Sequence, residues 1–177
     1  MKNIFIFDVE ATDLYGVGFC VAAIVATQKG EIIDQFCLMS IESISECCDF
    51  VKTKVYPALK DIPCCDTNKE LREKFFNFYM KYKECQIWSD VNFPVETKFL
   101  HDVVLDDTEN RMWNMPYPLL DMSTIVNVNI DRHNEYKRDN PDKKLMMHNP
   151  LDDCKASLHC LLKFFGTLWK VWYCERL

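Results

Sequence analysis

The first third of the chain alternates between apolar runs and short polar segments. Apolar, strand-forming runs at residues 2–7, 17–27 and 31–38 predict three strands. The sequence QKG at 28–30 is typical of a tight turn between the second and the third. Because the three runs follow one another closely, we expect them to form an antiparallel meander.

Beyond residue 45, helical spacing of apolar residues alternates with short strand-like runs. Thr67 is expected to cap a helix over 68–83, and Pro57 should end or kink an earlier helix over 45–59. The polar stretch 131–144 is expected to be a solvated loop, with a loop over a substrate groove as the alternative. The other predictions are a strand at 85–88, a helix opened by Pro94, a loop at 106–116, a short strand at 117–120, a brief helix capped by Asp121 or Ser123, and a largely buried last helix from Leu151 through Phe165 that could continue to Tyr173.

This order of elements predicts an α/β fold. Three antiparallel strands, followed by strands that alternate with helices, give a mixed central sheet flanked by helices. A chain of 177 residues is long enough to bury one core, so we expect a single domain over residues 1–177.

Composition and charge narrow the range of functions. The net charge of −6 argues against a protein that holds polyanions over a broad basic surface, but not against an enzyme that grips only a nucleic-acid end. Acidic residues interrupt the N-terminal apolar run, so it does not resemble a signal peptide, and the apolar run at 17–26 is too short to span a bilayer. We therefore expect a cytoplasmic protein without membrane contact.

The ten cysteines favour free thiols over disulfides. Several lie in apolar segments, where a thiol behaves as a small hydrophobic side chain. No C-x-x-C spacing occurs, so a structural zinc site is not predicted. Free thiols fit the reducing cytoplasm.

Two carboxylates follow the first apolar run, in the sequence IFIFDVE. Residues two apart on a strand point to the same face, so Asp8 and Glu10 would lie side by side at the edge of the core if the strand includes them. Like charges at this spacing repel and need neutralisation. Either the strand ends at Phe7 and both acids are solvated, or they bind a divalent cation such as Mg²⁺ or Mn²⁺.

A second candidate cluster comes from the segment MMHNPLDDC. His148 and Asp153 lie five positions apart, and Asp153 falls just inside the predicted last helix. The same spacing separates His101 from Asp106, so spacing alone proves little. Context favours the first pair, because an apolar helix anchored in the core gives a catalytic carboxylate rigid support.

Two further acids follow the predicted strand at 85–88, one directly after it and one in the next helix. Asp90 follows the strand directly and is otherwise explained as a turn residue. Glu96 lies in the first turn of the helix, where the helix dipole alone would favour an acid.

Taken together, these motifs resemble the DEDDh exonucleases, a branch of the ribonuclease H-like superfamily that includes polymerase proofreading domains and RNase T. The segment FDVEATDL is similar to the family pattern F-D-x-E-T-T-G-L, and HNPLDDC is similar to H-N-A-L-D-D-A. The resemblance extends in order and spacing over roughly residues 3–166.

The chain departs from the family pattern at several positions. Ala11 and Asp13 replace a usual Thr and Gly, and Pro150 stands where Ala is common. The middle motif usually reads N-x-x-F-D before a helix. Counted forward from the strand, its acid is Asp90, which we favour; counted back from the F-L of the helix, it is Glu96.

The resemblance implies a ribonuclease H-like fold and a metal-dependent 3′-to-5′ exonuclease acting on the 3′ ends of single-stranded RNA or DNA. Two Mg²⁺ or Mn²⁺ ions would then be the cofactors. RNase T-like enzymes are often dimers, so a homodimer is open. The implied site residues are Asp8, Glu10, Asp153 and either Asp90 or Glu96 as metal ligands, His148 as general base, and Thr12 and Leu14 as contacts to the 3′-terminal nucleotide.

Two other classes of function are compatible with the sequence. One is a nucleic-acid- or protein-binding module on the same fold that has lost catalysis. The other is a metal-dependent phosphohydrolase of small nucleotides. The sequence does not distinguish RNA from DNA as the substrate.

Overall fold

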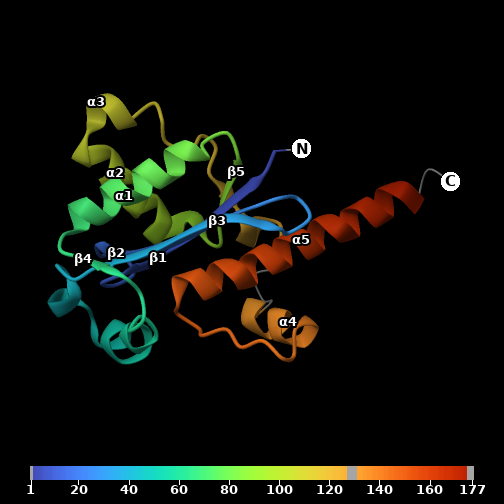
Figure 1. Ribbon diagram of the computed structural model, residues 1–177, viewed down its shortest axis with the longest axis horizontal. Helices are drawn as coiled ribbons and strands as arrows, with labels where there is room; N and C mark the ends of the chain where they lie inside the picture. The colour runs from blue at the N-terminus through green and yellow to red at the C-terminus, as the bar shows by residue number, and fades with distance from the viewer. Residues whose placement is uncertain (1, 127–130, 175–177) are drawn as a thin grey trace.

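A six-stranded mixed sheet forms the centre of the molecule, in the order β4-β3-β2-β1-β5-β6 (Figure 1). The computed structural model describes residues 2–126 and 131–174. β1, β2 and β3 form the predicted antiparallel meander, β4 runs parallel to β3, and β5 runs parallel to both β1 and β6. The strands are β1 (Ile4–Ala11), β2 (Gly18–Ala26), β3 (Ile32–Ser40), β4 (Cys64–Cys65), β5 (Gln86–Ser89) and β6 (Leu120–Asp121).

Helices cover both faces of the sheet, which completes a three-layer α/β architecture (Figure 1). One face packs against α1 and α2, the other against the long α5, and α4 lies beside α5. This arrangement confirms the predicted fold class. The helices are α1 (Asn68–Lys81), α2 (Thr97–Asp106), α3 (Thr108–Arg111), α4 (Arg132–Asp139) and α5 (Pro150–Cys174).

The alternation of side chains along β1 explains why both faces are covered. Phe5 and Phe7 point into the core under α1, and Ile4 and Ile6 point into the core under α5. All four are at most 1% exposed. β2 is buried along its whole length, as expected for a strand between two neighbours and two helical layers.

Local chemistry determines where several elements begin. The Thr67 hydroxyl caps α1 by accepting a hydrogen bond from the Glu70 backbone N–H at 3.1 Å, as predicted. The expected helix at 45–59 is instead three short turns, η1 (Ile44–Glu46), η2 (Val51–Val55) and η3 (Tyr56–Ala58), and Pro57 lies in the last. The helix expected from Pro94 begins at Thr97, after the irregular turn η4 (Asn92–Glu96).

Two segments predicted as loops contain helices. α3 lies within 106–116, and α4 lies within the polar stretch 131–144. The prediction of a solvated loop at 131–144 was wrong because Asp131 caps α4, accepting a hydrogen bond from the Asn134 N–H at 3.0 Å. The brief helix after β6 is η5 (Met122–Thr124), capped by Asp121 as predicted. Within the described ranges, no helix is both long and apolar enough to cross a membrane.

Candidate metal centre

The carboxylates of Asp8 and Glu10 are part of β1. The strand continues through both residues to Ala11, so the alternative in which it ends at Phe7 was wrong. Both side chains share the face of Ile4 and point toward α5. There they meet Asp153, and one carboxylate oxygen from each of the three residues lies within 4.8 Å of the others.

Asp153 is held by the anchored first turns of α5. The Asn149 side chain accepts a hydrogen bond from the Asp152 N–H at 3.3 Å and donates one to the Ala58 carbonyl at 3.1 Å. The next residue, Cys154, is buried with its thiol 3.8 Å from the Ile6 carbonyl oxygen. Asp153 therefore has the rigid support that a ligand or catalytic carboxylate needs.

The electrostatics of this cluster favour a cation. Burial raises the pKa of the Asp8 carboxyl well above its ordinary value, and the Asp153 and Glu10 charges raise it further. Burial and the Asp153 charge likewise raise the pKa of Glu10. Three convergent carboxylates are the donor set that Mg²⁺ and Mn²⁺ prefer, so the residues present fit such an ion.

Glu96 is buried near the same cluster and is only 6% exposed. Burial raises the pKa of its carboxyl to about 8, although hydrogen bonds with the backbone of Glu96 and Val9 act in the opposite direction. Its charge contributes to the raised pKa values of Asp8 and Glu10, so it lies within electrostatic reach of both. No described cation forms an ion pair with it.

Asp90 follows β5, as the sequence predicted, but it has a basic partner. The Arg132 Nε lies 2.5 Å from Asp90 Oδ1. Burial raises the pKa of Asp90 to about 6, and the Arg132 charge limits that rise. Asp90 lines the same pocket of about 320 Å³ as Asp8 and Glu10.

α4 contributes two residues that sequence reasoning missed. Besides the contact of Arg132 with Asp90, the His133 Nε2 hydrogen-bonds the Asp153 carboxylate. Each of these two basic side chains thus contacts one acid of the pocket. Nothing in the local sequence distinguishes this adjacent Arg-His pair from an exposed polar stretch, because both contacts join segments that are distant along the chain.

His148 lines the same pocket as the carboxylates. It is half-buried, and its ring packs edge-to-face on Phe50 with 5.6 Å between centroids. Its backbone is left-handed, with φ of 64°, a conformation that is uncommon for any residue except glycine. The loop before α5 thereby places His148 in the lining of the pocket.

The two predicted substrate contacts lie in the turn after β1 and differ in exposure. Thr12 is buried, and its hydroxyl accepts a hydrogen bond from the Val17 N–H at 3.1 Å, so this side chain organises the turn. Leu14 is 61% exposed. Beside it, the exposed ring of Tyr15 packs edge-to-face on Phe93 from η4, a second aromatic pair that the sequence did not single out.

Comparison by sequence gives no match to this chain, either among protein-family models or among curated proteins. Comparison of structures gives several chains of exonuclease I. One is an exonuclease I structure that suggests how processivity is achieved, with TM-score 0.64, 9% identity, and coverage of 96% of this chain and 44% of that one.

Two others are exonuclease I from the moderately thermophilic Methylocaldum szegediense and the zinc-bound E. coli enzyme in complex with single-stranded DNA. Each has TM-score 0.64, 10% identity, and coverage of 96% of this chain and 43% of the other. The chain thus spans less than half the length of these structures. The similarity shows that the fold is ribonuclease H-like.

Proposed function

We propose that the protein is a metal-dependent 3′-to-5′ exonuclease of the DEDDh type that acts on single-stranded nucleic acid. The observation that carries the proposal is the convergence of Asp8, Glu10 and Asp153, within 4.8 Å, at one end of the sheet. This cluster occurs in the fold that exonuclease I also has. The matching order of acidic motifs along the chain adds support.

Glu96 is our fourth acid. The contacts favour it over Asp90, which reverses the order expected from the sequence, because Arg132 already balances the Asp90 charge. Glu96 is buried beside the cluster without a cation of its own. When bound, two Mg²⁺ or Mn²⁺ ions would stabilise both the attacking and the leaving oxygen of a phosphodiester hydrolysis.

His148 is the proposed general base. It lines the pocket with the carboxylates, and an imidazole can take a proton from a water molecule near neutral pH. The left-handed backbone at 148 gives the ring an orientation that a regular first helical turn would not. The proton that His148 accepts would later leave to solvent through the open side of the pocket.

Three exposed apolar side chains next to the acids fit a single strand better than a duplex. Leu14, Tyr15 and Phe93 are each more than 60% exposed. Unpaired bases stack on such side chains, whereas paired bases do not offer their faces. The assay below tests whether the substrate is RNA or DNA.

The test is degradation of 5′-labelled single-stranded RNA and DNA of matched sequence with Mn²⁺, Mg²⁺ or EDTA. Wild type is compared with Asp8→Asn and Asp153→Asn, and with Asp49→Asn as an exposed control outside the pocket. We expect a metal-dependent ladder that shortens from the 3′ end, at least about a thousandfold slower in the two pocket variants.

Two outcomes would contradict the proposal. A folded wild-type protein that binds oligonucleotides but degrades none with any metal would be a binding module. Hydrolysis of small nucleotides without any attack on oligonucleotides would make it a phosphohydrolase of another class.

A further inference from the structure

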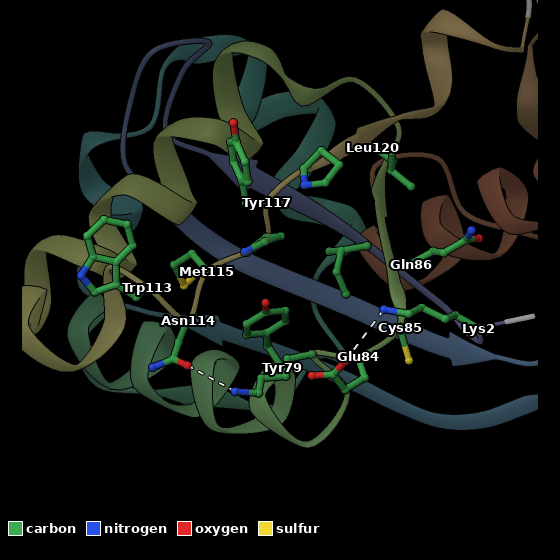
Figure 2. A pocket seen from close by; sticks show the side chains of 14 residues that line it. Lys2, Tyr79, Glu84, Cys85, Gln86, Trp113, Asn114, Met115, Tyr117 and Leu120 are labelled. Atoms are coloured by element: carbon green, nitrogen blue, oxygen red, sulfur yellow. Dashed lines mark hydrogen bonds and ion pairs between the residues drawn. The ribbon is translucent and has the colours of Figure 1, made fainter.

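A second pocket, of about 490 Å³, lies at the other end of the parallel strands from the carboxylates (Figure 2). It is bordered by the residues that precede β1 and β5 and by the segment 113–118, which leads into β6. The side chains of Tyr79 and Met115 lie within it (Figure 2). None of its lining residues takes part in the candidate metal centre.

Two large aromatic side chains at the rim of this pocket are exposed to solvent. Trp113 is 86% exposed and Tyr117 is fully exposed. In Figure 2 they project from two points of the same segment, on either side of Met115. Side chains of this size usually bury most of their surface, and exposed ones of this kind are enriched where a protein binds a partner. The described part of the chain supplies nothing to cover them.

The rim is also locally basic in an acidic protein. Lys2 and Lys83 line the pocket together with a single acid, Glu84, among the described residues. The Lys2–Glu84 pair is loose, at 3.8 Å between exposed groups, and Lys83 donates a hydrogen bond to the neutral Asn114 amide, at 3.3 Å. The local balance of +1 contrasts with the net charge of −6 for the whole chain.

We infer that this face, formed by Trp113, Tyr117, Lys2 and Lys83, binds a segment of single-stranded nucleic acid upstream of the 3′ end. Bases stack on the two aromatic rings, and phosphates lie near the two lysines. Aromatic rings combined with lysines are what sequence-tolerant single-strand binding requires. The inference rests on the proposed function only in treating the bound segment as part of the substrate.

The length of β1 gives the separation between this face and the metal centre. Asp8 lies six residue steps after Lys2 along the strand direction, which at about 3.3 Å per step is about 20 Å. At about 3.4 Å per stacked nucleotide, a strand needs about six nucleotides to reach from one to the other. A trinucleotide is therefore too short to contact both.

The test is binding of 5′-fluorescein-labelled oligonucleotides of 3 and 12 nucleotides in EDTA, followed by anisotropy. We expect Trp113→Ala with Tyr117→Ala to weaken binding of the 12-mer at least about tenfold and to leave that of the 3-mer unchanged. Tyr56→Ala, at another exposed aromatic residue, is the matched control. Trp113→Phe should keep most of the affinity but lose the quenching of tryptophan fluorescence that stacking produces.

An unchanged 12-mer affinity in the folded double variant would overturn the inference. So would binding of a proline-rich peptide to this face in place of the oligonucleotide. Because EDTA prevents cleavage, the result does not depend on catalysis. A separate cleavage assay with metal distinguishes the two failures. If only this inference is wrong, wild type still cleaves the 3-mer; if the proposed function is wrong, neither length is cleaved.

Discussion

The surroundings of Glu96 and Asp90 distinguish the two candidates for the proposed fourth acid. It is 6% exposed, near Asp8 and Glu10, and it lacks a basic partner among the described residues. Asp90 is closer to its strand in sequence but faces Arg132. A buried charge without a partner is costly, so we expect a cation bound by the nearby carboxylates to stabilise ionised Glu96 more than ionised Asp90.

Glu96→Gln is therefore expected to weaken Mn²⁺ binding about ten- to a hundredfold, the range typical for loss of a group that supports a metal site. Asp90→Asn should leave the affinity nearly unchanged. Titration calorimetry or the electron paramagnetic resonance signal of free Mn²⁺ measures both. The reverse pattern would return Asp90 to the ligand set and make Glu96 a buried structural acid.

The same residue predicts how stability depends on pH without metal. Burial raises the pKa of Glu96 from an ordinary 4.5 to about 8. Between these values the folded chain keeps a proton that the unfolded chain has lost, so stability falls as pH rises, by about 1.4 kcal/mol per unit at most. That is a few degrees of Tm per unit for a chain of this size.

Thermal unfolding in EDTA from pH 5 to 8 measures this effect. Asp8 and Glu10, whose pKa values are also raised, add to it. Glu96→Gln should flatten the fall, and Glu73→Gln, at an exposed position on α1, should not. Equal slopes in the two variants would contradict the assignment of the buried proton to Glu96.

At the scale of elements, α4 contacts two acids of the pocket through adjacent basic side chains. Arg132 pairs with Asp90 and His133 with Asp153. A cation that binds Asp153 must therefore compete with a hydrogen bond to His133. α4 itself is held to α5 by the contacts of Asp139 with His159 and Lys163, at 3.0 and 2.8 Å.

His133→Ala is expected to tighten Mn²⁺ binding, by about tenfold if the hydrogen bond to the charged carboxylate is lost without replacement. His159→Ala is the matched control, since it removes another His–Asp contact of α4 without touching the acids. Weaker Mn²⁺ binding by His133→Ala would instead mean that His133 orients Asp153 for the metal.

A largely buried charged pair joins α1 to the end of α2. Arg72 donates two hydrogen bonds to Asp106, at 2.6 and 2.9 Å, and both side chains are less than 15% exposed. Arg72→Met should cost about 3 kcal/mol in urea unfolding, because the largely buried Asp106 loses two hydrogen bonds and keeps only the longer contact with Arg111, at 3.9 Å. Adding Asp106→Leu should recover most of that loss.

The exposed pair Lys74–Glu70 on α1 gives the comparison. It is as short, at 2.6 Å, but both partners are at least 40% exposed. Lys74→Met should change the free energy of unfolding by less than about 1 kcal/mol. Similar costs for the two single variants would show that burial does not determine the value of the Arg72 pair.

Local patterns in the sequence predicted the meander, the caps at Thr67 and Asp121, and the shared face of Asp8 and Glu10. The helix α4 was missed although Asp131 is a good N-cap, because its sequence is polar on every side and gives no hydrophobic period. Its contacts with Asp90 and Asp153 depend on tertiary packing. The meeting of Asp153 with the β1 acids was expected only from the resemblance.

On the scale of the whole molecule, the net charge of −6 limits how the proposed nucleic-acid substrate could be held. Two lysines near the upstream strand predict a shallow salt dependence, with a slope of log affinity against log salt of about −1.4. Binding of a 12-mer in EDTA from 50 to 300 mM KCl measures the slope. A slope steeper than about −4, or tighter binding to long duplexes, would reveal a broad basic surface.

The candidate metal centre brings together residues from the two ends of the described chain. Asp8 and Glu10 lie in the first strand, and Asp153 lies in the last helix, so more than 140 residues separate the ligands. A ribosome must therefore release the start of α5 before the centre can assemble. During synthesis the growing chain therefore carries Asp8 and Glu10 without their third partner, and the cluster forms only after more than 140 further residues have been added.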